Sequence, residues 1–314
     1  MHVSELGLGC ARIGGIFQRD SGGFVELLSA AYDHGINFFD TADMYSQGES
    51  EQLIGQAFRH RRQHVVIASK VGYVLPGQRK LIARIKPLVR ATLPAAVSGQ
   101  ISQSFEPPYL HKAVEASLRR LRTDYLDLLQ LHSPPAEIVA RGHWVRALED
   151  LQRAGKIRHY GVSCDTLEAA QAALSVPGVR SLQLVVSLLV PSVASAIAAQ
   201  VQARGVAIIA RECLANGLLA KAEGDYDLKA YCHSPEQEAA RRAELTAHRT
   251  RAEQRGIALS TLALEYATSA PGVAVALVGA SRTEQLHETV RAFMSAGAYG
   301  HTMAKQHGAP IRLA

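Results

Sequence analysis

NFFDTADMYSQGESEQLIGQAFRH, residues 37–60, contains an apolar strand-like run at 37–40, a loop, and a segment of helical periodicity at 49–60. The same succession recurs along the chain. Further apolar runs predict strands at 5–9, 64–70, 125–132, 159–163, 181–186, 205–210 and 273–279. Segments of helical period or composition lie between them, at 24–34, 109–121, 137–154, 167–174 and 193–203. Such alternation indicates parallel strands joined by right-handed crossovers.

Eight parallel strands in a chain of 314 residues favour a closed (β/α)8 TIM barrel, which we expect to form one domain over residues 1–314. No glycine-rich GxGxxG follows the first strand, so an open dinucleotide-binding sheet is not indicated. Two stretches, 74–108 and 221–254, interrupt the alternation, and the second ends in a charged helical run. Both follow strands, so we expect them at the C-terminal mouth of the barrel, where barrel enzymes keep their sites.

Composition excludes several classes of protein. The net charge of +6 is spread along the chain, so no nucleic-acid partner is expected. The four cysteines form no CxxC pair, so neither a metal site nor a disulfide framework is expected. The N-terminal residues lack the pattern of a signal peptide, and no apolar run is long enough to span a membrane. We therefore expect a soluble, cytoplasmic protein, as a monomer or a small homo-oligomer.

Four residues that can carry proton chemistry lie at or just beyond the ends of successive predicted strands: Asp40, Tyr45, Lys70 and His132. Each has an ordinary structural interpretation. A strand-terminal Asp can cap a helix, a Tyr can pack half-buried, a Lys can reach solvent, and a His can be a hydrogen-bonded core residue. In a parallel barrel, however, all four converge on one rim, and this joint placement favours the functional interpretation.

The chemistry of such a set follows from the tyrosine. A phenol with a pKa of about 10 is a weak acid near neutrality. We expect Lys70 to lie within a few ångströms of Tyr45, to favour the phenolate and to lower its pKa, with Asp40 holding the lysine charged. His132 would hydrogen-bond a substrate carbonyl oxygen. Such a set polarises a carbonyl but supplies no electrons, so a hydride donor is needed.

The chain resembles the aldo-keto reductase family in several long motifs that occur in the family's order. They are GINFFDTADMYSQGESEQLIGQAF, VVIASKVG, SLRRLRTDYLDLLQLHSP, LQRAGKIRHYGVS, GLLA after GVAIIA, and VALVGASRTEQLHETV. The resemblance implies NADPH-dependent interconversion of small carbonyl compounds and alcohols on a (β/α)8 barrel, with NADH as a possible cofactor. It also implies that the four residues above form a catalytic tetrad in which Tyr45 is the general acid during reduction.

The resemblance also implies residues that bind the nicotinamide cofactor. Ser163 and Gln183 match positions that hold the nicotinamide carboxamide. The loop along the pyrophosphate is matched by Leu214, Gly217 and Leu218, and the grip on the adenosine phosphate by Gly279, Ser281, Arg282 and Gln285. VGASRTEQ is also a strand-to-helix turn, whose free backbone N–H groups suit an anion. Alternatively, Ser281 or Thr283 only caps the helix and Arg282 is solvated.

The sequence departs from the family pattern at several places. Cys164 stands where the family commonly has Asn, so one amide contact to the nicotinamide is lost or is replaced by Asp165. Arg211 stands where an aromatic or polar residue often stacks on the nicotinamide, and we expect it to contact the cofactor pyrophosphate. Cys10 and Ala11 replace a bulkier pair beside the reacting carbonyl, which leaves room for a larger substrate. The N-terminal hairpin that closes the bottom of the barrel is shortened.

The residues therefore favour an NADPH-dependent reductase of aldehydes or ketones. Two alternatives remain open at this point. One is an NAD(P)+-dependent sugar or aldose dehydrogenase that works in the oxidising direction. The other is a barrel protein that senses the nicotinamide cofactor with little turnover, although the intact tetrad counts against it.

Overall fold

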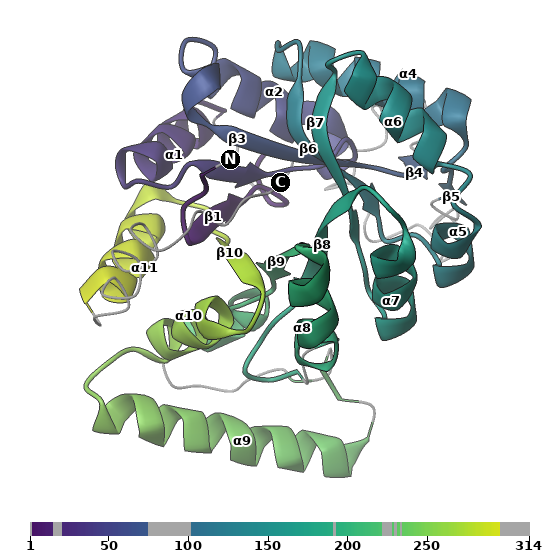
Figure 1. Cartoon of the computed structure of the whole chain (residues 1–314). Coiled ribbons are helices and arrows are strands. Elements are labelled where there is room, and N and C mark those ends of the chain that lie inside the picture. The colour runs from purple at the N-terminus through teal and green to yellow at the C-terminus, as the bar shows by residue number, and fades with distance from the viewer. Residues whose placement is uncertain are drawn as a thin grey trace, which may run out of the picture.

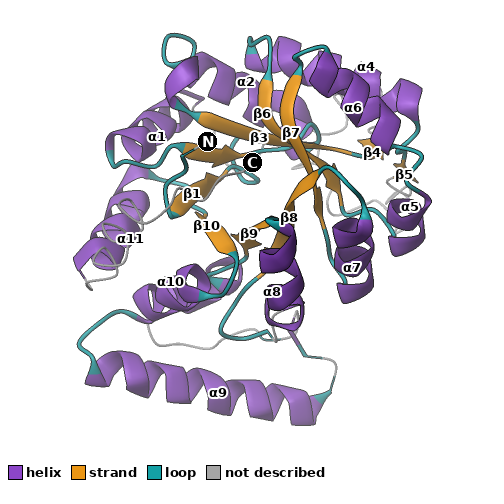
Figure 2. Cartoon of the chain, in the orientation of Figure 1, coloured by secondary structure: helices purple, strands orange, loops and turns teal. Residues whose placement is uncertain are grey.

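The barrel strands of the computed structural model are parallel and close on themselves in the order β1-β10-β9-β8-β7-β6-β3-β2 (Figure 2). The structure describes residues 2–14, 21–74, 102–190, 193–221, 228, 231–232 and 234–295. The strands are β1 (Leu6–Gly9), β2 (Phe38–Asp40), β3 (Val66–Val71), β6 (Leu126–His132), β7 (Ile157–Ser163), β8 (Val179–Val185), β9 (Ala207–Arg211) and β10 (Val273–Val278). The predicted (β/α)8 barrel and its eight strands are confirmed.

Helices surround the strands (Figure 1). They are α1 (Ser21–Asp33), α2 (Glu49–Ala57), α4 (Pro107–Leu121), α5 (Ala136–Arg141), α6 (Val145–Arg153), α7 (Leu167–Ser175), α8 (Val193–Arg204), α9 (Pro235–Gln254), α10 (Leu259–Ser269) and α11 (Thr283–Ser295). The single helix predicted at 137–154 is wrong, because α5 and α6 are separate. Gly142, with φ of +64°, ends α5 in the left-handed conformation that glycine adopts without steric cost.

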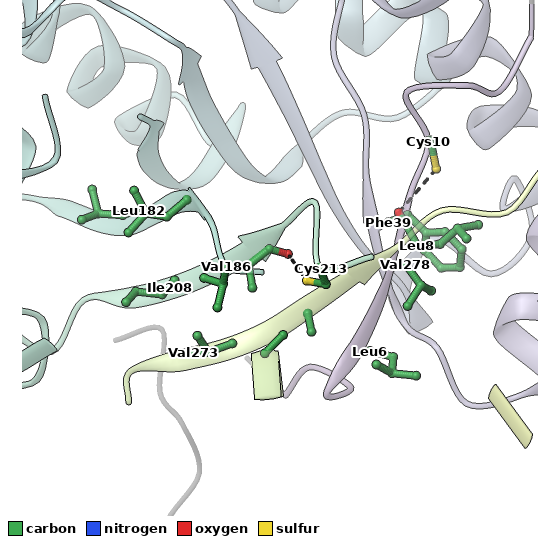
Figure 3. Packing of buried hydrophobic residues seen from close by; sticks show 14 of the residues in the cluster. Leu6, Leu8, Cys10, Phe39, Leu182, Val186, Ile208, Cys213, Val273 and Val278 are labelled. Atoms are coloured by element: carbon green, nitrogen blue, oxygen red, sulfur yellow. Dashed lines mark hydrogen bonds between the residues drawn. The ribbon is translucent and has the colours of Figure 1, made fainter. Parts of the chain in front are cut away.

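Side chains alternate between the two faces of β3, as the two-residue period of a strand requires. In β3, Val66 and Ala68 belong to an apolar cluster inside the barrel, whereas Ile67 and Val71 pack into the larger core between strands and helices. Figure 3 shows part of this larger core, in which the thiols of Cys10 and Cys213 are hydrogen-bonded to backbone carbonyls of Leu8 and Ala210. The inner cluster fills the lower half of the barrel and leaves its carboxyl end to polar side chains.

No strand precedes β1 among residues 2–5. Residues 2–5 nevertheless cover the lower end of the barrel. Val3 packs against the inner apolar cluster, and the Ser4 N–H donates to Oδ1 of Asn37 at 2.8 Å. Asn37 immediately precedes β2, so residues 2–5 are fixed to the bottom of the barrel rather than left loose.

The two stretches that interrupt the alternation are described only in part. In the first, β4 (Tyr73–Val74) pairs with β5 (Ser102–Gln103) in a small antiparallel sheet. Residues 75–101 between these strands, which include a run rich in Arg and Lys at 79–90, lie outside the described residues. The charged helical run of the second is confirmed as α9, which packs on α10 at the outside of the barrel (Figure 1). Within the described residues, no helix combines the length and the apolarity needed to cross a bilayer.

Candidate active site

Polar side chains occupy the inward positions at the carboxyl ends of the strands. Asp40 ends β2, Lys70 is the last inward residue of β3, and His132 ends β6. Strand register aligns these ends, with Asp40 beside Ala68 and Lys70 beside Gln130. Three members of the predicted tetrad therefore come from neighbouring strands, and the loop after β2 brings in the fourth, Tyr45.

Lys70 is the centre of this group. Its side chain is fully buried, and its ammonium nitrogen donates to Oδ2 of Asp40 at 2.6 Å, to the backbone oxygen of Thr41 at 3.0 Å and to the Tyr45 hydroxyl at 3.2 Å. Burial by itself lowers the pKa of Lys70, but Asp40 and Tyr45 outweigh it and raise the pKa above the ordinary value. The lysine is therefore a fixed positive charge against the phenol, as the sequence predicted.

Asp40 is held by more than the lysine. Its Oδ1 accepts a hydrogen bond from Nε2 of Gln183 at 2.7 Å and lies 3.5 Å from Nε2 of Gln130. Both glutamines are buried inside the barrel. A buried carboxylate needs such donors, because an ion without partners in a low-dielectric interior is strongly destabilising.

The pKa of Tyr45 lies above its ordinary value of 10. Burial is the largest cause, and Asp40 adds to it; Lys70 acts in the opposite direction but does not prevail. The expectation that Lys70 lowers the pKa of Tyr45 below that value is therefore wrong, because spacing in sequence reveals the neighbouring cation but not the degree of burial. The phenol is protonated at neutral pH, which suits it to donate a proton.

Tyr45 begins a short 3-10 helix, Tyr45–Gly48, between β2 and α2. Ser46 and Gln47 have left-handed backbones, and the Ser46 hydroxyl donates to the carbonyl oxygen of Ile13 at 2.9 Å. This contact ties the loop that carries Tyr45 to the loop that follows β1. The phenol is therefore positioned by two loops that meet at the same end of the barrel.

The imidazole of His132 is neutral. Burial, followed by the positive charges of Lys70 and Arg211, lowers its pKa to about 3. Its ring meets the ring of Tyr45 edge-on, with 5.8 Å between centroids, and that of Tyr73 in the same way at 4.8 Å. Nδ1 is buried and has no hydrogen-bond partner among the described residues.

A cavity of about 330 Å³ opens beside the tetrad. Asp40 and Tyr45 lie on its wall, and it extends to the turn between β10 and α11. Seven of the residues predicted to bind the cofactor line it: Gln183, Arg211, Leu214, Gly217, Gly279, Ser281 and Gln285. Three do not. Ser163 and Leu218 are buried, and Arg282 is exposed.

The wall of the cavity includes backbone that a ligand could approach closely. A Cβ built at Gly217 or Gly279 would meet no neighbouring atom within 4 Å, so the backbone at both positions leaves open space for a ligand. Ala215, Asn216 and Gly217 have positive φ in one continuous turn along the wall. At the far end, the Ser281 N–H donates to Oε1 of Gln285 at 3.1 Å, so a side chain within the turn satisfies this donor.

Arg211 lines the cavity and makes two ion pairs. Its guanidinium contacts Asp165 at 2.5 Å, and it also pairs with Glu212. Arg211, one of the departures from the family pattern, therefore contacts Asp165, the residue suggested to replace the amide lost at Cys164. From the sequence, Asp165 was expected to contact the nicotinamide and Arg211 the pyrophosphate. In the structure the two side chains form an ion pair with each other.

Sequence reasoning missed several residues of the site. Arg12, Glu212 and Asn216 line the cavity, and Asn216 donates to the Tyr231 hydroxyl at 3.0 Å. No periodicity marks these loop residues. Gln130 carried a usable signal, since it is a polar residue two positions before His132 and therefore on the same face of the strand. In the part of the chain that the structure describes, no three His, Cys, Asp or Glu side chains gather as metal ligands would.

Comparison with known proteins gives consistent results. A sequence model described as the aldo/keto reductase family matches residues 5–298. The uncharacterised oxidoreductase YqkF of Bacillus subtilis is 27% identical over 296 residues, which cover 93% of this chain and 88% of the relative. The holo form of aldo-keto reductase AKR11C1 from Bacillus halodurans has a TM-score of 0.74 and 29% identity, covering 93% of this chain and 87% of that one. An aldo/keto reductase from Klebsiella pneumoniae, solved with NADP and acetate, has a TM-score of 0.65 and 26% identity, covering 93% and 86%.

Proposed function

The chain belongs to the aldo/keto reductase family, and we propose that it reduces an aldehyde or a ketone to the alcohol, with NADPH as the cofactor and Tyr45 as the general acid. The observation that carries this proposal is the contact of 3.2 Å between the Lys70 ammonium and the hydroxyl of Tyr45, which lies in the wall of the cavity. A protonated phenol beside a permanent cation can donate its proton and then be stabilised as the phenolate.

The stabilisation by Lys70 is greater after proton transfer than before it. The neutral phenol gains only a hydrogen bond from the ammonium, whereas the phenolate gains a full ion pair with it. An interaction that strengthens as charge develops accelerates the chemical step. Asp40 keeps Lys70 charged and oriented, and Gln183 holds Asp40 from the other side of the barrel.

His132 has a different role. With a pKa of about 3 the imidazole carries no charge at neutral pH, so it does not compete with Tyr45 as a proton donor. A neutral imidazole retains one N–H, which can donate a hydrogen bond to the substrate carbonyl oxygen. We assign His132 to orientation and polarisation of the carbonyl.

The cofactor would lie along the cavity between Tyr45 and the turn before α11, held by Gln183, Leu214, Gly217, Gly279, Ser281 and Gln285. NADPH supplies the hydride when it is bound. Arg282 stands at the start of α11, where an exposed guanidinium can meet the 2′-phosphate that distinguishes NADPH from NADH. The relative from Klebsiella pneumoniae was solved with NADP, which supports this choice of cofactor.

The raised pKa of Tyr45 supports the reducing direction. Oxidation of an alcohol needs a phenolate as the base, and burial makes the phenolate scarce at neutral pH. The buried ion pair of Lys70 with Asp40, in contact with Tyr45, supports turnover rather than cofactor sensing alone.

The room for bulky groups beside the substrate carbonyl depends on Ala11 rather than on Cys10. Ala11 lines the cavity, whereas Cys10 is fully buried and hydrogen-bonded to the oxygen of Leu8. The small side chain of Ala11 supports a substrate with bulk next to its carbonyl group.

The proposal is tested by measuring NADPH oxidation with a panel of aldehydes, ketones, sugars and quinones, for wild type and for Tyr45→Phe. Removal of a general acid lowers kcat by about 10²- to 10⁴-fold. NADPH affinity, measured by quenching of protein fluorescence, should be unchanged. Tyr266→Phe, at an exposed tyrosine on α10, is the matched control and should retain the wild-type rate. Full activity of Tyr45→Phe would show that another group supplies the proton.

A further inference from the structure

The β4–β5 sheet is fixed against the end of β6. Tyr73 in β4 pairs with Gln103 in β5. The Gln103 amide donates to the backbone oxygens of His132 at 3.0 Å and of Ser133 at 3.1 Å. The sheet is therefore attached to the backbone that carries His132.

Tyr73 itself is held from both sides. The Tyr109 hydroxyl donates to the backbone oxygen of Tyr73 at 3.0 Å, and the Ser104 N–H donates to the oxygen of Gly72 at 2.8 Å. Gly72 has φ of +143°, and a Cβ there would lie 2.5 Å from the Phe105 ring. Any other residue at 72 would force the chain away from Phe105, so the backbone that presents Tyr73 is tightly specified.

This rigid support places the Tyr73 ring against His132. The centroids are 4.8 Å apart with an interplanar angle of 81°, which is closer than the contact of His132 with Tyr45 at 5.8 Å. Edge-to-face contacts between rings have a preferred geometry, so they restrict rotation of the imidazole. Catalytic histidines are commonly oriented by a hydrogen bond to one ring nitrogen, but Nδ1 of His132 has no partner among the described residues.

We propose that Tyr73 is a positioning residue whose ring fixes the His132 imidazole in place of that hydrogen bond. The proposal rests on the proposed function, in which His132 binds the substrate carbonyl oxygen. A neutral imidazole carries one N–H, and a buried N–H without an acceptor is unfavourable. The proton therefore resides on Nε2, Nδ1 keeps its lone pair, and the Nε2–H donates to the carbonyl oxygen. The ring of Tyr73 is required for this, whereas its hydroxyl is not.

The test combines nitrogen-15 NMR of histidine-labelled protein with steady-state kinetics. His132→Gln identifies the His132 signals. In wild type we expect one neutral tautomer with the proton on Nε2. Tyr73→Leu should give mixed tautomers and lower kcat by about tenfold, with NADPH affinity unchanged. Tyr73→Phe should restore the single tautomer and most of the lost rate. Tyr73→Met removes the ring in a second way, should the leucine variant fail to fold.

Val74→Ala is the matched control, because it alters the same β4–β5 sheet without removing the ring. A single unchanged tautomer together with a normal kcat in Tyr73→Leu would overturn the proposal. So would equal damage from Tyr73→Phe and Tyr73→Leu, since the hydroxyl would then be the active group. If wild type reduces no carbonyl compound, the proposed function fails, but the NMR comparison still decides whether Tyr73 orients His132.

Discussion

Nε2 of Gln183 lies 2.7 Å from Oδ1 of Asp40, across the interior of the barrel. Resemblance to the family assigns Gln183 to the cofactor, yet in the structure its amide nitrogen holds the carboxylate that holds Lys70. Gln183 also lines the cavity. One side chain therefore stands between the cofactor site and the proton-donating group, and its Oε1 and second N–H remain for a ligand.

Replacement of Gln183 should therefore affect both catalysis and binding. Gln183→Met keeps the length of the side chain but removes the donor to Asp40. A hydrogen bond to a charged group contributes about 1.5–3 kcal/mol, so kcat should fall by about tenfold or more, and NADPH should bind more weakly. Ser163→Ala, on the neighbouring strand, is the control and should not lower kcat to the same extent. Loss of affinity alone in Gln183→Met would restrict Gln183 to cofactor binding.

The pH dependence of reduction follows from the raised pKa of Tyr45. A general acid acts in its protonated form, and burial keeps the phenol protonated beyond its ordinary pKa of 10. The value of kcat/KM for reduction should therefore be level across neutral pH and decline only above about pH 10. His132 contributes no inflection near pH 6.5, because its pKa is about 3. A fall in reduction rate between pH 6 and 8 that disappears in Tyr45→Phe would contradict this assignment of the acid.

The strands and the three tetrad residues at strand ends were predictable because they follow from periodicity, whereas Tyr45, in the loop after β2, was marked by its distance from Asp40 in the sequence and by the family resemblance. A strand in a barrel alternates its side chains, so a polar residue at the end of an apolar run marks the rim, as at Asp40 and His132. The loop residues that complete the cavity have no such pattern. Arg12 is one solvent-exposed arginine among many in the sequence, and only its place beside the cavity distinguishes it.

Burial was the second property that the sequence could not supply. The lysine next to Tyr45 was predicted, but the direction of the tyrosine pKa depends on how much water the surrounding strands exclude. The break in the predicted helix at 137–154 has a local cause, a glycine whose left-handed backbone ended the first segment. Glycine is favoured just after a helix end but also occurs in helix interiors at a cost of about 1 kcal/mol relative to Ala, so composition alone did not place the break.

Discrimination between NADPH and NADH is expected at Arg282. Its side chain is exposed at the start of α11, next to Ser281 and Gln285 in the cavity wall. Arg282→Ala should weaken NADPH binding by about ten- to a hundredfold and leave NADH binding nearly unchanged, since a guanidinium–phosphate contact contributes about 1.5–3 kcal/mol. Calorimetric titration with each cofactor measures the ratio. Arg291→Ala, at an exposed position later in the same helix, is the control. An unchanged ratio in Arg282→Ala would remove Arg282 from the phosphate site.

A pH-dependent effect on stability is expected at Asp43, close to the tetrad. Its Oδ1 is buried without a hydrogen-bond partner among the described residues. Burial, followed by the charge of Glu51, raises its pKa from 3.8 to about 7, against the opposing effect of Arg120. The folded chain therefore binds this proton more tightly than the unfolded chain. Between pH 4 and pH 7, Asp43 reduces the free energy of unfolding by about 1.4 kcal/mol for each pH unit of increase.

Asp43→Asn removes this dependence, so the variant should gain stability over wild type as the pH rises from 4 to 7. His132 acts with the opposite sign, because its folded pKa of about 3 makes the unfolded chain bind more protons below pH 6.5. The two slopes oppose each other in wild type, so the measurement must compare denaturant unfolding of the variant and wild type at each pH. Asp124→Asn, at an exposed carboxylate, is the control. Only a group whose proton affinity changes on folding makes the free energy of unfolding depend on pH. If the difference in this free energy between Asp43→Asn and wild type stays constant from pH 4 to pH 8, Asp43 is ionised in the folded protein and the prediction is wrong.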